Sequence, residues 1–299
     1  MKVKSMNETL PLPSTPYGYF SPDEAFWQVN RELLIILAGA RAVMLELAHP
    51  LVAAGVAQHS NFRRDSLGRL YRTVFMMVDA TFGSAETARR AVGRVYRCHR
   101  AVEGVLPTSV GPFAAQTGYQ ANDPHLKLWV LATLIDSILL VHDLFVRPLS
   151  LAEKEAYYRD SRLLGRMLGI PAPVLPPAYA DFTAYVERMF NSDTLTVGDT
   201  AREVTATIFG SPPGALIRAV SFAGLGLLPP RLRADFNIPW DDRRERRLQW
   251  LARQARGLRA TLPPALCVWP HALLGQWRFE RTKNCKDQSP SRTSYSSGD

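Results

Sequence analysis

The spacing of hydrophobic and polar positions predicts a chain built from helices. Apolar residues recur three and four positions apart between residue 21 and about residue 262, which is the period of an amphipathic helix. No convincing run of β-branched residues alternates with polar ones, as it would in half-buried strands. The pattern predicts about nine or ten helices. We therefore expect an all-α fold that forms a single multi-helix domain.

Prolines, glycines and capping residues set the expected ends of these helices. The first helix follows Ser21, which can act as its cap, and ends before Pro50, because the residue that precedes a proline disfavours helical geometry. Gly83 and Gly104 stand where glycine commonly ends a helix. The expected helices span residues 21–49, 64–82, 84–104, 122–147, 150–170, 178–190, 199–209, 212–227 and 240–262.

The composition indicates one large folded domain, flanked by terminal segments of a different composition. Of the 299 residues, 46% are hydrophobic and 21% are charged, which is enough to bury a large core. Residues 1–20 read as an extended lead-in interrupted by prolines. From residue 281 the chain is rich in Lys, Ser, Asp and Gly, so residues 281–299 are expected to be disordered. The helical domain is accordingly expected to cover residues 21–280.

Charge and cysteine usage limit the classes of partner. The net charge is +9. The basic residues are 30 arginines and only six lysines, and the arginines are spread along the chain. A solvated basic exterior fits this spread better than a nucleic-acid surface. The three cysteines lack the CxxC spacing of zinc sites and the CxxCH motif of covalent haem attachment. With no apolar signal segment at the N-terminus, a cytoplasmic location is expected.

Two apolar stretches raise the question of a membrane span. Residues 33–56 contain Arg41, Glu46 and His49, and residues 128–146 contain Asp136 and Asp143. Each charge at a bilayer centre costs about 2.5–3.5 kcal/mol. Both stretches are therefore expected to be buried helices, with the aspartates neutralising buried arginines such as Arg41. A peripheral contact of the protein with a membrane is compatible with this expectation.

Residues 41–73 place unusual polar groups in this apolar setting. Arg69, Arg72 and Thr73 are spaced i, i+3 and i+4, so they share one helical face, which Met76 continues. A polar group that is buried without a partner costs about 1–3 kcal/mol, so the cluster needs an explanation. The face fits either the exposed first turns of a surface helix or one wall of a cofactor pocket.

His99 is the second candidate. Val92, Val95 and Val102 lie seven, four and three positions away, so His99 shares an apolar helical face. Cys98 points about 100° away and is not expected to bind the same metal. The pattern alone favours a core histidine over a metal ligand.

A non-haem iron site is a further alternative. Glu46 and His49 form one ExxH unit of the kind found in di-iron bundles, but the second unit such a site needs is missing. A non-haem iron enzyme would have to use Glu46, His49 and His59 together. Motifs for nucleotide binding, GxSxG hydrolysis and HExxH zinc proteolysis do not occur in the sequence.

Several ordered blocks of sequence resemble the rubber-oxygenase family, which includes latex-clearing proteins and MpaB-type oxygenases. The blocks run from about residue 17 to residue 271 and include AHPLVAAGVAQHSNFRRDSLGRLYRT, HRAVEG, YQANDPHLKLWVLATLIDS and FVRPLSLAEKEAYYRDSRLLGRMLGIP. The resemblance implies a globin-like helical core that holds haem b. It also implies cleavage of carbon–carbon double bonds in isoprenoid chains by dioxygen.

The resemblance assigns roles residue by residue. The segment VYRCHRAV is similar to the one that carries the family's proximal haem ligand, which makes His99 the iron ligand. The segment GRLYRT makes Arg69 and Thr73 distal residues. Arg72 stands where latex-clearing proteins carry a lysine that can cap the iron, which a permanently charged guanidinium cannot readily do. Leu131 replaces a histidine that many relatives carry in a WVHA segment.

The sequence therefore predicts a haem b-dependent oxygenase that acts on an apolar, isoprenoid-type substrate with dioxygen. His99 would bind the iron, and Arg69, Thr73 and Met76 would line the haem. Arg69, Arg72 and Thr73 would act in catalysis. Two alternatives stay open: a non-catalytic haem- or lipid-binding protein of the same fold, and the non-haem iron enzyme.

Overall fold

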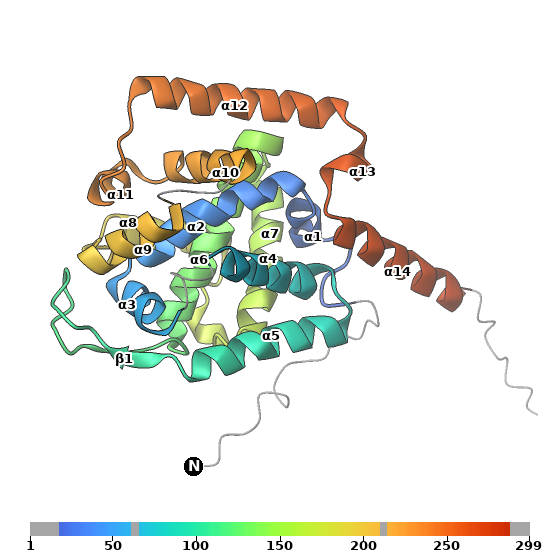
Figure 1. Ribbon diagram of the computed structural model, residues 1–299. Coiled ribbons are helices and arrows are strands. Elements are labelled where there is room, and N and C mark those ends of the chain that lie inside the picture. The colour runs from blue at the N-terminus through green and yellow to red at the C-terminus, as the bar shows by residue number, and fades with distance from the viewer. Residues whose placement is uncertain (1–17, 61–65, 210–213, 288–299) are drawn as a thin grey trace, which may run out of the picture.

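The computed structural model describes residues 18–60, 66–209 and 214–287, and within these ranges the all-α prediction is confirmed (Figure 1). The helices up to the middle of the chain are α1 (Ala25–Asn30), the 3-10 helix η2 (Leu33–Leu37), α2 (Ala38–Leu47), α3 (Pro50–His59), α4 (Ser66–Phe82), α5 (Ala85–Arg100), α6 (Pro124–Val141) and the π-helix η3 (His142–Val146). The later ones are α7 (Leu151–Met167), the 3-10 helix η4 (Ala172–Val174), α8 (Tyr179–Phe190), α9 (Asp199–Phe209), α10 (Ala215–Gly226), α11 (Pro230–Asp235), α12 (Asp242–Thr261), α13 (Pro264–Cys267) and α14 (Pro270–Asp287).

The first expected helix is broken into α1, η2 and α2. Glu32 has an extended backbone at the break and is buried. Its carboxylate accepts hydrogen bonds of 2.6 and 2.9 Å from Arg259 on α12, and its backbone forms a bridge with Val268. These contacts come from residues more than 200 positions away, so the local helical pattern did not reveal the break.

A small sheet interrupts the helices, which the sequence did not predict. β1 (Glu103–Val105) pairs antiparallel with β2 (Gly118–Gln120), with Gly104 opposite Tyr119. A Cβ atom at position 104 would lie 2.7 Å from the Tyr119 hydroxyl, so only glycine fits this close approach. The α5 helix consequently ends at Arg100 and not at Gly104. Three-residue strands are too short to show a period of two.

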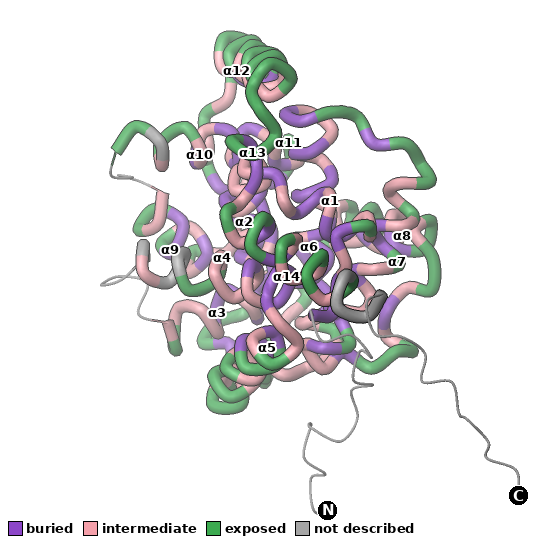
Figure 2. Tube along the Cα trace, turned by 90° about the vertical axis from the view of Figure 1, so that its right-hand side faces the viewer, coloured by how far each residue is buried: buried purple, intermediate pink, exposed green. Residues whose placement is uncertain are grey.

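The α6 helix occupies the centre of the core (Figures 1 and 2). It packs on α2, where the buried Trp129 donates its indole N–H to the Leu45 carbonyl at 3.1 Å. The continuous segment 124–146 is long and apolar enough to span a bilayer, yet 67% of its most apolar window is buried by the rest of the protein. A segment formed by η2, α2 and α3 meets the same test only as a pair of helices bent by 104°. The structure places both apolar stretches as core helices.

The C-terminal helices α11, α13 and α14 were not predicted. The α14 helix runs to Asp287, six residues beyond the expected start of the tail. Arg278 on α14 donates to the Phe82 carbonyl at the end of α4, and Ala272 is buried. Residues 288–299, and with them the remaining part of the disorder prediction, lie outside the described residues.

Candidate functional site

The α4 and α5 helices, which carry the predicted haem residues, form a hairpin. The chain turns at Gly83, and the Ser84 hydroxyl caps α5 by accepting a hydrogen bond from the Thr87 N–H at 3.2 Å. Farther along, Arg94 on α5 forms a 3.3 Å ion pair with Asp79 on α4. The α5 helix therefore runs back beside α4 (Figure 1).

His99 lies on the inward face of α5. Positions three or four apart along this face are buried or half-buried: Ala88, Val92, Val95, His99 and Val102. On the outer side of the helix, Arg90, Arg94 and Arg97 are exposed, and so is Cys98. The structure thus agrees with the apolar face predicted for His99.

The predicted face of α4 changes from solvent-exposed to buried along the helix. Arg72 and Thr73 are exposed, Met76 is half-buried, and Ala80 one turn later is fully buried. Arg69 lies within α4, but its side chain is outside the part of the chain that the structure describes. Polar side chains therefore stand at the open end of the α4–α5 hairpin, on the helix next to His99.

The residues of the non-haem alternative do not come together. His49 stands just before α3 and His59 ends it, so ten residues of helix, about 15 Å, separate them. His59 is exposed, and its Nε2 lies 2.9 Å from the Glu103 carbonyl oxygen. Within residues 18–60, 66–209 and 214–287, no three His, Cys, Asp or Glu side chains are grouped to hold a metal ion. A single ion shared by Glu46, His49 and His59 does not fit this arrangement.

His49 instead lines a solvent-open cavity of about 740 Å³ that the sequence did not reveal. Three parts of the chain enclose it: the α2–α3 junction, the β1–β2 hairpin with its loop, and the start of α6. Its walls are half apolar, with Leu51, Val105, Phe113, Tyr119 and Leu126, and half polar, with His49, Glu103, Gln120, Asp123 and His125. Of these residues, Asp123 stands at the start of the helix that the sequence predicted over residues 122–147. Its carboxylate caps α6 by accepting hydrogen bonds from the N–H groups of His125 and Leu126.

The imidazole of His49 is neutral at pH 7. The side chain is 6% exposed, and its Nδ1 has no hydrogen-bond partner. Its ring lies 5.3 Å from the ring of Phe113. Burial lowers the pKa of His49 to about 4, and the negative charge of Asp123 offsets this only in part. A neutral imidazole offers the cavity one N–H donor or one acceptor nitrogen, without a charge.

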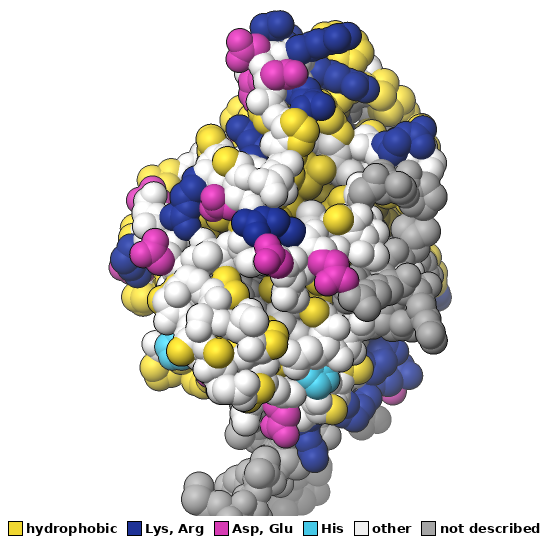
Figure 3. Space-filling view, turned by 60° about the vertical axis from the view of Figure 1, so that its left-hand side comes forward, with side chains coloured by type: hydrophobic (Ala, Val, Ile, Leu, Met, Phe, Trp, Pro, Cys, Tyr) yellow, Lys and Arg dark blue, Asp and Glu magenta, His cyan; other side chains and the backbone are white. Residues whose placement is uncertain are grey.

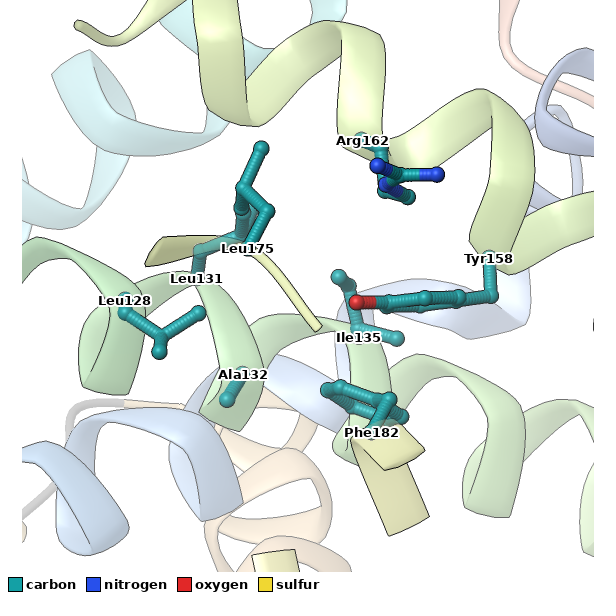
Figure 4. A pocket seen from close by; sticks show the side chains of 8 residues that line it. All are labelled: Leu128, Leu131, Ala132, Ile135, Tyr158, Arg162, Leu175 and Phe182. Atoms are coloured by element: carbon teal, nitrogen blue, oxygen red, sulfur yellow. The ribbon is translucent and has the colours of Figure 1, made fainter. Parts of the chain in front are cut away.

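A second void lies beside Leu131 (Figure 4). Leu131, Ile135, Leu175 and Phe182 point into it, and Tyr158 and Arg162 stand at its edge. It contains about 200 Å³ of space between atoms but has no room for a water molecule. We interpret it as imperfect packing of an apolar core region, because a binding site needs space for a ligand.

Comparisons with known proteins agree with this picture. The family described as "ER-bound oxygenase mpaB/B'/Rubber oxygenase, catalytic domain" matches residues 27–257. An uncharacterized protein of Mycobacterium bovis and one of Mycobacterium tuberculosis are each 29% identical over 258 residues, which cover 82% of this chain and 96% of the relative. No solved structure matches the chain significantly, so the globin-like arrangement stays a prediction.

Proposed function

We propose, from the premise that this chain belongs to the family of mpaB/B' and rubber oxygenase catalytic domains, that it is a haem b-dependent oxygenase. Membership makes it an oxygenase-type protein, which implies dioxygen and an organic substrate. Haem b as cofactor and an apolar, isoprenoid-type chain as substrate are our proposal, as is a cytoplasmic location.

The position of His99 carries this proposal. Haem b provides four nitrogen ligands of its own, so the protein needs to supply one imidazole and no cluster of acidic residues. His99 is half-buried on the inward face of α5, and Arg72 and Thr73 on the neighbouring helix α4 are exposed. The residues present therefore fit a haem that His99 binds from the α5 side.

The residues on α4 would act on dioxygen or the substrate at such a haem. When bound, haem would supply the activation of dioxygen. The Thr73 hydroxyl and the guanidinium of Arg72 can donate hydrogen bonds that orient oxygen or the substrate. Arg69 stands on the same face by its spacing, and Met76 supplies an apolar contact deeper in the hairpin.

The cavity at His49 is our candidate for the substrate-binding space. Glu103 in its wall follows His99 by four residues in sequence, and Val102 packs against the cluster of Leu51 and Tyr119. The apolar half of the wall suits a hydrocarbon chain. The neutral imidazole of His49 can donate to a carbonyl group without needing a counter-ion.

Two alternatives make different predictions. A non-catalytic haem- or lipid-binding protein would follow if Arg72 and Leu131 mark the loss of catalytic function. The non-haem iron enzyme is disfavoured, because His49 and His59 stand at opposite ends of α3.

The test combines pyridine haemochrome analysis with oxygen uptake on squalene, a polyprenyl test substrate. Haem b together with substrate-dependent uptake and carbonyl products by mass spectrometry would support the proposal. Haem without uptake would identify a carrier, and iron-dependent uptake without haem would identify the non-haem enzyme. Either result would overturn the proposal.

A further inference from the structure

Exposed apolar side chains are concentrated near the C-terminal end of the described chain. Among the described residues, seven of the nine large hydrophobic side chains that are strongly exposed lie between positions 250 and 277: Trp250, Leu258, Leu262, Leu266, Leu273, Leu274 and Trp277. Leu266 is 64% exposed and Trp250 is 52% exposed. A concentration of this kind marks an interaction surface more often than scattered single residues do.

The α12 helix is held to the protein by its inner face. Leu248 and Ala252 on this face are buried. Arg256 donates to the carbonyls of Asp143 and Leu144 at 2.8 and 2.9 Å, and Arg259 pairs with the buried Glu32. These contacts fix the orientation of the helix and turn its opposite face to solvent.

That outer face is strongly basic. Arg243, Arg246 and Arg253 are exposed, and none forms an ion pair with another described residue. Trp250 lies among them on the same side of the helix by its spacing. Figure 3 shows Lys and Arg side chains gathered over the top of the molecule, where α12 lies, beside hydrophobic side chains. The helix thus presents positive charge and apolar surface together.

Further exposed apolar side chains follow α12 along the chain. Leu262 and Leu266 belong to the connection through α13, and Leu274 and Trp277 belong to α14. Figure 2 looks onto this side, with α13 and α14 in front, α12 above them and exposed segments along all three helices. We call the outer face of α12 with these exposed leucines and tryptophans the C-terminal surface.

We propose that the C-terminal surface docks on an anionic lipid bilayer without crossing it. Exposed tryptophan and leucine side chains insert at the boundary between headgroups and acyl chains, and arginines attract acidic lipids. A nucleic acid would use the arginines but would leave Leu258, Leu266 and Leu274 without a role. Docking would bring the protein to the lipid bilayer, into which apolar molecules partition. The proposal does not depend on haem or on catalysis.

Vesicle flotation tests the proposal. The full-length protein is mixed with vesicles of phosphatidylcholine alone, or with vesicles in which roughly one-third of the lipid is phosphatidylglycerol. We expect binding to the anionic vesicles that weakens as salt is added, because screening shortens the reach of surface charges. Binding that is equally strong to both vesicles, or to neither, would contradict the proposal.

Matched variants assign the binding to the surface. Arg246→Glu with Arg253→Glu should weaken binding by about 10-fold or more, since each arginine near an anionic surface contributes about 1 kcal/mol. Leu266→Ser with Leu274→Ser should do the same by removing apolar insertion. The controls are Arg166→Glu with Arg188→Glu, which makes the same charge change on α7 and α8, and Leu151→Ser, an exposed leucine on α7.

The controls should bind as the unmodified protein does. Equal losses in the control and test variants would show that total charge, and not this surface, drives binding. A dimer in vesicle-free solution that Leu266→Ser with Leu274→Ser dissociates, without vesicle binding, would show that a second copy covers the surface. Tight binding of an RNA oligonucleotide without vesicle binding would assign the arginines to nucleic acid. Any of these three results would overturn the proposal.

Discussion

Arg41 Nη1 on α2 lies 2.6 Å from Asp136 Oδ2 on α6, and this ion pair joins the two helices at the centre of the core. Arg41 is 3% exposed, and its guanidinium also donates to the Leu227 carbonyl at 2.9 Å and to the Ser137 hydroxyl at 2.8 Å. The sequence predicted this pairing, because charges in an apolar helix need a partner. Asp136 therefore compensates a buried cation, which has a measurable consequence for stability.

Replacing Asp136 with alanine should lower the free energy of unfolding by about 2–3 kcal/mol. Removing one partner of a buried pair typically costs about 3–5 kcal/mol, and the partial exposure of Asp136 reduces the loss. Urea unfolding at neutral pH measures the change. Glu86→Ala, which removes the exposed pair with Arg90, should cost no more than about 0.5 kcal/mol. Equal effects of the two variants would contradict this account of Arg41.

The lowered pKa of His49 should make stability depend on pH. Its folded pKa of about 4 lies below the unfolded value of about 6.5, so the unfolded chain binds more protons between these values. Stability should therefore be at its full value above about pH 6.5 and fall as pH drops toward about 4. Between about pH 7 and about pH 5 the contribution of His49 should be about 2 kcal/mol.

Urea unfolding of His49→Gln at both pH values isolates this contribution. The variant should lose less stability than the unmodified protein between the two pH values, because it lacks the titrating group. His142, whose pKa burial also lowers, is present in both proteins and cancels in the comparison. His125→Gln, at an exposed histidine, should keep the original pH dependence. An unchanged slope in His49→Gln would refute the buried neutral imidazole.

Thr73→Ala should reduce turnover by about 10-fold or more while leaving haem content and stability unchanged. Thr73 is an exposed residue, so the substitution should cost little folding energy, whereas an oriented donor contributes up to a few kcal/mol to a transition state. Oxygen uptake and haem absorption measure the two quantities. Thr207→Ala, at an exposed threonine on α9, serves as the control. Full activity in Thr73→Ala would remove Thr73 from the proposed site.

Arg72 should leave the iron open in the resting ferric protein. A guanidinium group has hydrogen-bond donors only, so it cannot offer a lone pair to iron. The ferric protein should be five-coordinate or water-bound and should accept added imidazole, as absorption and electron paramagnetic resonance would show. Arg72→Lys should convert it toward a low-spin form, whereas Arg72→Leu should keep it open. A low-spin spectrum of the unmodified protein would point to a second protein ligand.

Local signals predicted the helices that local residues define. Gly83 and Ser84 mark the turn between α4 and α5, and Asp123 marks the start of α6. Ser150 marks the start of α7, where it forms a capping box with Glu153. The break before α2 was missed, because the partner of Glu32 is Arg259, 227 positions away. The β1–β2 hairpin was missed because its strands are too short for a recognisable period.

In the candidate site, too, features within one helix could be predicted from the sequence, and features built from several elements could not. The inward position of His99 followed from its spacing to Val92, Val95 and Val102, because one helix contains all four. The cavity at His49 did not follow, because its walls come from three elements that only the fold brings together. The separation of His49 from His59 became apparent only when Pro50–His59 proved to be one continuous helix.

The most direct test of the account is the haem content of the His99→Ala variant. We expect the unmodified protein to bind haem b and His99→Ala to fold with the same circular dichroism and melting temperature but to hold little haem. His59→Ala, at an exposed histidine outside the hairpin, should bind haem normally. The pyridine haemochrome spectrum quantifies all three proteins. Full haem occupancy with an unchanged spectrum in His99→Ala, or an unmodified protein that binds no haem b, would contradict the account.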